Sequence, residues 1–247
     1  YFPKDIIVTN IGLEHLDYYK DIEDIKSAFK EFLTHAEGKV IGCGDDLNVR
    51  SIVEEAILYG FDESNDVVIR NLVLDETGSS FDLYYKSKLL GNFKIALYGK
   101  HMVLNAAAAI TYSHIICGIN IEDVKKYILE FKGAKRRFKS TDINGTILID
   151  DYAHNPVEIS TVIASAKQKY PNKKIVSVFF ENTFSRTEKF YKEYAEVLKE
   201  SDEVFVTDIL SDREKKKDYP NVGPNLILDL LENGHYLNID NFIDKII

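Results

Sequence analysis

The sequence is short of cysteine and of long hydrophobic runs. Its 247 residues include two cysteines, Cys43 and Cys117, which lie far apart. Neither their number nor their spacing suggests a disulfide framework or a zinc site, so a reducing cytoplasm is the expected location. No apolar run is long enough to span a bilayer and no signal peptide opens the chain, so we expect a cytoplasmic protein without a membrane partner.

Positive charge is also scarce. The chain has 31 lysines and arginines against 40 aspartates and glutamates, a formal net charge of −9. Without a basic stripe to contact a phosphate backbone, a nucleic-acid partner is not expected, and a small-molecule partner is favoured. The one dense basic cluster is Lys135, Arg136 and Arg137, and such a run is about as often a solvated face as a binding site.

Glycine-rich phosphate-binding loops are missing as well. The chain contains neither a GxxxxGK[ST] nor a GxGxxG sequence, so it lacks the strongest signature of a nucleotide enzyme. It begins at Tyr1 without an initiator methionine, and its single methionine is Met102. These features predict a fragment of a longer protein.

The stretch richest in chemical groups is 144–158, which reads NGTILIDDYAHNPVE. Residues 146–149 are expected to form a buried strand, and Pro156 suits the first residue of a helix. Open α/β sheets bind ligands at the carboxyl ends of such strands. Adjacent strand residues point to opposite faces, so one aspartate would face a ligand and the other could cap the helix. The polar groups where the strand ends are Asp150, Asp151, Tyr152 and His154.

Strand and helix alternate through the first half of the chain, which predicts parallel pairing with right-handed crossovers. An antiparallel set of strands is expected over residues 66–98, where three extended runs follow one another. The expected strands before it are 5–10 and 39–42, and the expected helices are 21–36, 48–59, 101–116 and 121–131.

A basic loop at residues 133–138 marks a predicted boundary between domains 1–135 and 136–247. Three βα units then predict a Rossmann-like, doubly wound domain. The polar loop 211–222 is the best candidate for a mobile segment. The expected strands are 146–149, 174–180 and 203–209, and the expected helices are 156–170, 187–200 and 224–234.

Two further groups of polar residues are candidate binding residues. His15, with Glu14 and Asp17, could supply a ligand to Mg²⁺, which needs few protein groups, although solvated loop charges are the favoured alternative. Arg136 and Arg137 could approach a phosphate, because a guanidinium matches its oxygens.

The loop 181–187, ENTFSRT, follows the next expected strand. Arg186 there could bind a carboxylate substrate. Ser185 or Thr187 is expected to cap the following helix.

Several of these motifs, in this order and spacing, resemble the Mur ligase family. The matching stretches are VTNIGLEHLDYY, IGCGDD, GKHMVLNAAAAI, FKGAKRRF, IDDYAHNPVEI and FSRT. The resemblance implies an ATP-dependent amide-forming enzyme with a sugar-nucleotide domain, a central ATPase domain and a C-terminal Rossmann-like domain. The chain would then be part of the central domain and most of the C-terminal one, with the P-loop and the sugar-binding domain upstream. Within the family it is most similar to the members that join L-alanine to UDP-N-acetylmuramate for peptidoglycan.

The resemblance also implies roles for individual residues. The sugar carboxylate would attack the γ-phosphate of ATP, and the amine of alanine would then displace phosphate from the acyl phosphate. Arg137, Tyr152 and His154 are the residues expected to act in catalysis. The implied contacts are His15 with Mg²⁺, His101 and Asn105 with adenine, Arg137 with ATP phosphate, Asp151 with ribose, and Tyr152, His154 and Arg186 with the amino acid.

The chain departs from the family pattern at three places. Met102 replaces the first asparagine of an HNxxN motif, and Glu181 and Asn182 stand where alanine ligases usually carry proline and histidine. Lys30 lies about where related ligases have a carbamylated lysine, and we expect an ordinary surface lysine instead.

Two alternative functions remain open from the sequence. One is a ligase that adds a preformed tripeptide to the same sugar, although Phe138 and Tyr152 favour the alanine enzyme. The other is a non-catalytic binding module with this fold, suggested by Met102 and Asn182. The oligomeric state is not predicted.

Overall fold

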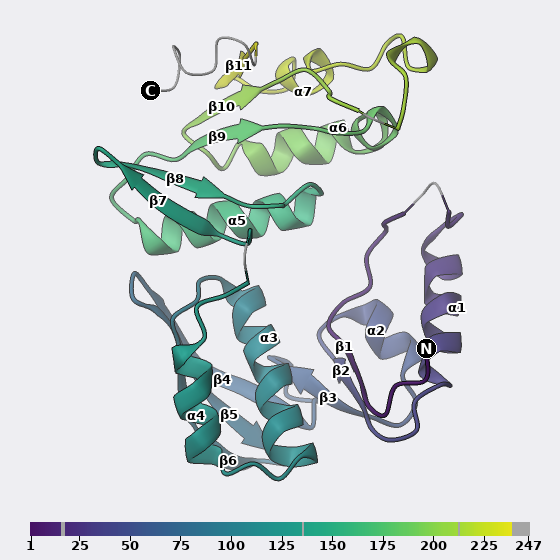
Figure 1. Cartoon of the computed structure of the whole chain (residues 1–247), viewed down its shortest axis with the longest axis vertical. Coiled ribbons are helices and arrows are strands. Elements are labelled where there is room, and N and C mark those ends of the chain that lie inside the picture. The colour runs from purple at the N-terminus through teal and green to yellow at the C-terminus, as the bar shows by residue number, and fades with distance from the viewer. Residues whose placement is uncertain (16–17, 135, 212, 239–247) are drawn as a thin grey trace. The chain divides into compact units, whose positions relative to one another are not determined.

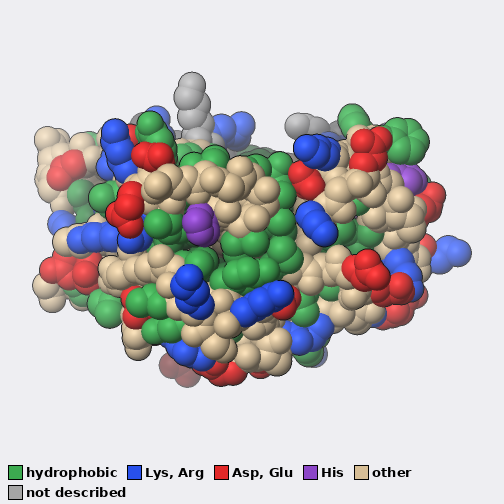
Figure 2. Space-filling model, turned by 90° about the horizontal axis from the view of Figure 1, so that it is seen from below, with side chains coloured by type: hydrophobic (Ala, Val, Ile, Leu, Met, Phe, Trp, Pro, Cys, Tyr) green, Lys and Arg blue, Asp and Glu red, His purple; other side chains and the backbone are tan. Residues whose placement is uncertain are grey.

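The computed structural model describes residues 1–15, 18–134, 136–211 and 213–238. The chain divides into two compact units, Tyr1–Lys132 and Gly133–Ile247. Among the described residues, no helix is both long and apolar enough to cross a membrane. Side chains of both charges surround hydrophobic ones on the face drawn in Figure 2.

The first unit is built on one six-stranded mixed sheet with the strands in sequence order (Figure 1). The strands are β1 (Ile6–Val8), β2 (Val40–Cys43), β3 (Ala56–Gly60), β4 (Val67–Asp75), β5 (Gly78–Tyr85) and β6 (Lys88–Ile95). Strands β1 to β4 pair parallel with one another in succession, and β5 pairs antiparallel with both β4 and β6. This confirms the predicted addition of antiparallel strands to a parallel sheet.

Helices pack against this sheet through apolar faces. The core of the unit includes Phe81 and Phe93, whose rings stack at 5.9 Å, together with Val103 and Ala107 of α3. The N-cap of α3 is Gly99 at φ +89°, a left-handed conformation that favours glycine. The helices are α1 (Ile22–Leu33), α2 (Leu47–Ile52), α3 (Lys100–Ile110), which continues as a π-helix (Thr111–Ile116), and α4 (Ile121–Glu130).

The prediction of one helix over residues 48–59 is wrong. Helix α2 ends at Ile52, because Val53 takes an extended backbone conformation, and residues 56–60 form β3. This short strand pairs with β2 on one side and β4 on the other. Pairing on both sides outweighs the weak helical preference of a segment this short.

The side chain of Asp82 on β5 gives the first unit an acid-sensitive contact. Its carboxylate accepts hydrogen bonds from Asn71 Nδ2 at 2.7 Å and Asn92 Nδ2 at 3.0 Å. These bonds hold the pKa of Asp82 below its ordinary value of 3.8. The unfolded chain therefore binds the proton more readily. The stabilisation is fully present above the ordinary pKa and is lost as the pH falls through the lowered one.

We therefore expect Asp82→Asn to flatten the acid side of the stability profile. Wild-type stability should fall more steeply than that of the variant below pH about 4, where the unfolded carboxyl takes up its proton. Urea denaturation followed by circular dichroism at a series of pH values measures both slopes. Glu130→Gln, at an exposed position of α4, is the control. Identical acid slopes for wild type and Asp82→Asn would contradict the prediction.

The second unit combines a hairpin with a small parallel sheet. In the sheet, β9 (Val176–Phe179), β10 (Glu203–Val206) and β11 (Gly234–Tyr236) pair parallel in the order β11-β10-β9. The helices are α5 (Pro156–Lys169), α6 (Phe184–Leu198) and α7 (Asn225–Leu228), with a 3₁₀ turn at Lys216–Asp218. The predicted α/β class, with a Rossmann-like second unit, is confirmed.

The strand predicted at 146–149 exists, but its setting differs from the prediction. It is β8 (Thr146–Asp150), and it pairs antiparallel with an unpredicted strand, β7 (Lys139–Ile143). Asn144 and Gly145 between them have φ of +52° and +89°, as in the two-residue turns that close hairpins. The strand was expected to be buried, yet the side chain of Leu148 is exposed.

Candidate functional site

The carboxyl end of β8 brings together the predicted residues of the 144–158 stretch. Asp151 uses both carboxylate oxygens on backbone amides, accepting from Phe138 N at 2.7 Å and from Ala153 N at 2.8 Å. It thereby ties the segment that precedes β7 to the segment that follows β8. Arg136 and Phe138 on that segment have positive φ, so these bonds hold a backbone that is unfavourable for such residues.

Two arginines flank the ring of Tyr152. The guanidinium carbons of Arg136 and Arg137 lie 5.6 Å and 5.5 Å from the ring centroid, and the ring of His154 meets it edge-on at 5.2 Å. A guanidinium over an aromatic face is held in place while its N–H groups can still bind anions. The two guanidinium groups are therefore placed where they could contact phosphate or carboxylate oxygens.

Glu158 connects the members of this cluster, and the sequence analysis did not single it out. Its Oε2 accepts the backbone N–H of His154 at 3.1 Å and lies 3.3 Å from Nδ1 of the same residue. Its Oε1 lies 3.9 Å from Nη1 of Arg137. The signal available in the sequence was the spacing of Asn155 and Glu158, which resembles a capping box.

The N-cap of α5 corrects an expectation about the aspartates. Asn155 caps the helix, and its Oδ1 accepts from Glu158 N at 2.9 Å. The cap is therefore neither Asp150 nor Asp151. Asp150 is exposed at the end of β8.

The loop that carries these residues is anchored in the core of the second unit by Tyr194. This residue is fully buried, and its hydroxyl donates to the carbonyl oxygen of His154 at 2.8 Å. Its ring packs against Phe179 of β9 at 4.8 Å. The position of His154 therefore depends on the same packing that stabilises the sheet.

Arg186 lies in the first turn of α6, beside a buried acid that the sequence analysis noted only as a departure. Its Nη1 lies 3.4 Å from Oε1 of Glu181 and 3.2 Å from Oδ1 of Asn182. The side chain of Glu181 is 2% exposed, and among the described residues its Oε2 has no hydrogen-bond partner. Two of the three departures from the family pattern, Glu181 and Asn182, thus contact the predicted carboxylate-binding arginine.

Helix α6 is capped from a distance, so the expectation that Ser185 or Thr187 caps it is wrong. The carboxylate of Glu214 accepts from the backbone amides of Phe184 and Ser185 and from the Ser185 hydroxyl. The N-cap residue Thr183 makes no side-chain capping bond. A carboxylate at a helix N-terminus satisfies free amides and favours the helix dipole.

The remaining predicted residues lie in the first unit. His101 and Asn105 are on α3, where Asn105 Nδ2 lies 3.9 Å from the sulfur of Met102. His15 has φ +53°, and Asp17 lies outside the described residues. No group of three potential metal ligands occurs among the described residues. Lys30 is exposed and pairs with Glu54 at 3.1 Å.

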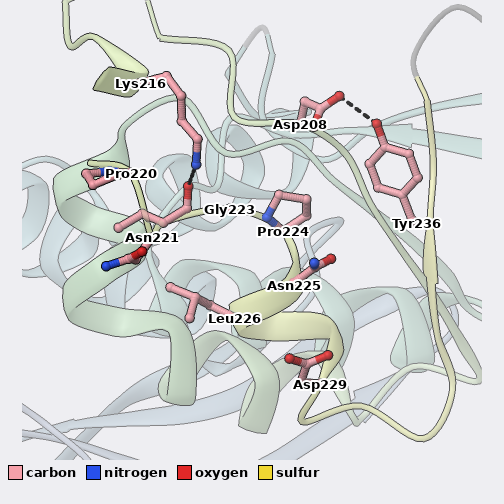
Figure 3. A pocket seen from close by; sticks show the side chains of 11 residues that line it. Asp208, Lys216, Pro220, Asn221, Gly223, Pro224, Asn225, Leu226, Asp229 and Tyr236 are labelled. Carbon is pink, nitrogen blue, oxygen red and sulfur yellow. Dashed lines mark hydrogen bonds between the residues drawn. The ribbon is translucent and has the colours of Figure 1, made fainter. Parts of the chain in front are cut away.

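A cavity of about 610 Å³ lies beyond the carboxyl end of β10 (Figure 3). The hydroxyl of Tyr236 donates to Asp208 at 2.6 Å, and this bond raises the pKa of Tyr236. Lys216 donates to the carbonyl oxygen of Val222. None of the predicted site residues lines the cavity. Its lining is Asp208, Lys216, Pro220, Asn221, Val222, Gly223, Pro224, Asn225, Leu226, Asp229 and Tyr236.

Comparison with known families assigns both units. Residues 3–113 match the Mur ligase middle domain, and residues 136–244 match the glutamate ligase domain of Mur ligases. The chain belongs to the Mur ligase family. The resemblance seen in the motifs is thereby confirmed.

Mur ligases that act on alanine are among the relatives of this chain. It is 36% identical over 243 residues to UDP-N-acetylmuramate–L-alanine ligase of Lactococcus lactis subsp. cremoris strain SK11, covering 98% of this chain and 55% of the relative. The same enzyme of L. lactis subsp. lactis strain IL1403 gives the same identity and coverage. The chain therefore spans about half the length of the curated relatives it matches.

Solved structures share the fold of this Mur ligase chain. UDP-N-acetylmuramate-alanine ligase from Thermotoga maritima has a TM-score of 0.78 at 23% identity, covering 100% of this chain and 54% of that one. Folylpolyglutamate synthase from Mycobacterium tuberculosis, complexed with ADP and AMPPCP, has a TM-score of 0.75 at 16% identity, covering 98% and 56%. At these identities the likeness concerns the fold alone.

Proposed function

We propose that this chain is part of an ATP-dependent ligase that joins L-alanine to UDP-N-acetylmuramate in peptidoglycan precursor synthesis. The observation that carries the proposal is the 36% identity over 243 residues to ligases named for that reaction. The guanidinium groups of Arg136 and Arg137 support it, because acyl phosphate chemistry requires groups that counter developing negative charge.

The proposed reaction has two steps. The carboxylate of the sugar nucleotide attacks the γ-phosphate of ATP, giving ADP and an acyl phosphate. The amine of alanine then attacks the acyl carbon and releases phosphate. Arg137 stabilises the phosphate oxygens, while Tyr152, His154 and Arg186 orient the amino acid. His101 and Asn105 contact adenine, and Asp151 contacts ribose. Each carboxylate oxygen of Asp151 accepts one backbone N–H and can still accept a hydrogen bond from a ribose hydroxyl.

In this scheme His15 would hold a magnesium ion, although an imidazole nitrogen is a poorer ligand for this ion than an oxygen. A nitrogen of His15 could complete a coordination shell made mostly of phosphate oxygens and waters, because Mg²⁺ keeps several waters and needs few protein groups. When bound, the ion would neutralise charge on the phosphates.

The test compares two proteins. The 247 residues alone contain no phosphate-binding glycine loop, so we expect them to release no ADP with ATP, UDP-N-acetylmuramate and L-alanine. The reconstituted ligase, in which the N-terminal region of the L. lactis relative precedes Tyr1, is expected to release ADP only when both substrates are present. Turnover by the 247 residues alone would contradict the fragment interpretation.

The same assay separates the alternatives. The reconstituted ligase is expected to prefer L-alanine to a preformed tripeptide. Preference for the tripeptide would assign the chain to the recycling reaction. A correctly folded reconstituted ligase that is inactive with both acceptors would favour a binding module.

A further inference from the structure

The protonation pattern of His154 can be read from the atoms around its ring. Nδ1 lies 2.9 Å from the carbonyl oxygen of Tyr152 and 3.3 Å from Oε2 of Glu158. Both neighbours only accept hydrogen bonds, because one is a carbonyl and the other a carboxylate. The neutral ring must therefore carry its proton on Nδ1, which leaves the lone pair on Nε2.

Nε2 is the ring atom of His154 that can accept a proton from a bound molecule. It makes no hydrogen bond within the part of the chain that the structure describes, and the His154 side chain is 26% exposed. The lone pair can therefore receive a proton from a molecule that binds at the end of β8.

Glu158 is placed to support such a proton transfer. Protonation of Nε2 makes the ring an imidazolium, whose charge the carboxylate beside Nδ1 would balance. The same carboxylate accepts the backbone N–H of His154 and lies 3.9 Å from Arg137. The contact with Arg137 is long and partly exposed, so it contributes little to the position of the arginine or to the stability of the fold.

We infer that Glu158 is a positioning residue that keeps Nε2 of His154 ready to deprotonate the ammonium group of the incoming amino acid. An N–H bond of the ammonium breaks and an Nε2–H bond forms, giving a neutral amine and an imidazolium. The amine can then attack the acyl phosphate, and the imidazolium later returns its proton to solvent. The inference rests on the proposed function for its substrate, although the tautomer itself does not.

The first experiment measures the tautomer in the 247-residue chain. Long-range ¹H–¹⁵N spectra of labelled protein, recorded where the imidazole is neutral, should show His154 protonated at Nδ1 and unprotonated at Nε2. Glu158→Ala should shift the ring only in part toward protonation at Nε2, because the Tyr152 carbonyl still accepts from Nδ1, whereas Glu188→Ala, at an exposed position of α6, should not shift it. A wild-type ring protonated at Nε2 would overturn the inference whatever the chain catalyses.

The second experiment separates proton transfer from general damage. Hydroxylamine is largely unprotonated at neutral pH, so it can capture an acyl phosphate without a base. In the reconstituted ligase, Glu158→Ala should slow ligation of L-alanine about 100-fold, within the range of general base catalysis. It should leave hydroxamate formation within about threefold of wild type, because that nucleophile needs no deprotonation.

Glu158→Gln tests the charge separately from the hydrogen bond. It keeps an acceptor oxygen, so the tautomer should persist, while ligation of alanine falls about tenfold because the imidazolium loses its counter-charge. Equal slowing with alanine and hydroxylamine in either variant would overturn the inference. A wild-type reconstituted ligase that forms no product with either nucleophile would instead refute the proposed function, and the tautomer would still decide the role of Glu158.

Discussion

Replacement of Arg137 by alanine is expected to lower kcat of the reconstituted ligase by about 100- to 1,000-fold, the usual cost of removing one donor that stabilises charge in a transition state. The guanidinium lies over the ring of Tyr152, a contact that exists before substrate binds. Steady-state ADP release at saturating substrates measures the effect. KM for L-alanine should change less than kcat, because the arginine acts on the phosphate.

Arg136 provides a matched control for this prediction. It lies over the same ring, at 5.6 Å, and the described residues give it no ion pair with Glu158. Arg136→Ala is therefore expected to cost less than about tenfold in kcat. Arg137→Lys should be intermediate, because lysine keeps the charge but loses the planar fork. The phosphate role would have to be abandoned if Arg137→Ala kept at least a third of the wild-type kcat.

Tyr194→Ala is expected to lower the stability of the second unit by about 3 to 5 kcal/mol, as for other large buried aromatic residues. The side chain is fully buried and packs on Phe179, so its removal leaves a cavity in the small core. A chain of two units need not unfold in one step. Hydrogen exchange at the amides of Val204 and Val206 on β10 reports the second unit alone.

Tyr194→Phe separates the packing from the hydrogen bond. It keeps the ring and removes only the hydroxyl that donates to His154 O, which should cost about 1 kcal/mol. Equal loss of protection in the two variants would show that the hydroxyl dominates. Unchanged exchange in Tyr194→Ala would show that the ring does not stabilise this core.

The alternation of strands and helices was predictable because it depends on local periodicity. The predictions failed where partners distant in the chain decided the structure. Residues 56–60 became a strand because β2 and β4 lie on either side of them. Strand β7 has the polar sequence KSTDI, so no hydrophobic alternation marked it, although the Asn144–Gly145 pair that follows it is typical of a hairpin turn.

The candidate site rests largely on motifs, whereas the contacts inside it were not predicted. Motifs pointed to Arg137, Asp151, Tyr152, His154 and Arg186, but no local pattern indicates that a carboxylate on α5 contacts both the arginine and the histidine. Likewise, Arg186 pairs with Glu181, at a position where the family pattern predicts proline. Contacts of this kind depend on the placement of whole elements.

The distant cap of α6 has a consequence for how this unit folds during synthesis. The carboxylate that holds the amides of Phe184 and Ser185 comes from Glu214, which is 30 and 29 residues further along the chain. The helix leaves the ribosome well before its cap. Its first turn therefore lacks this capping carboxylate until β10 and the segment after it have been translated and docked. Formation of the helical turn that carries Arg186 is thus coupled to a segment about 30 residues further along the chain.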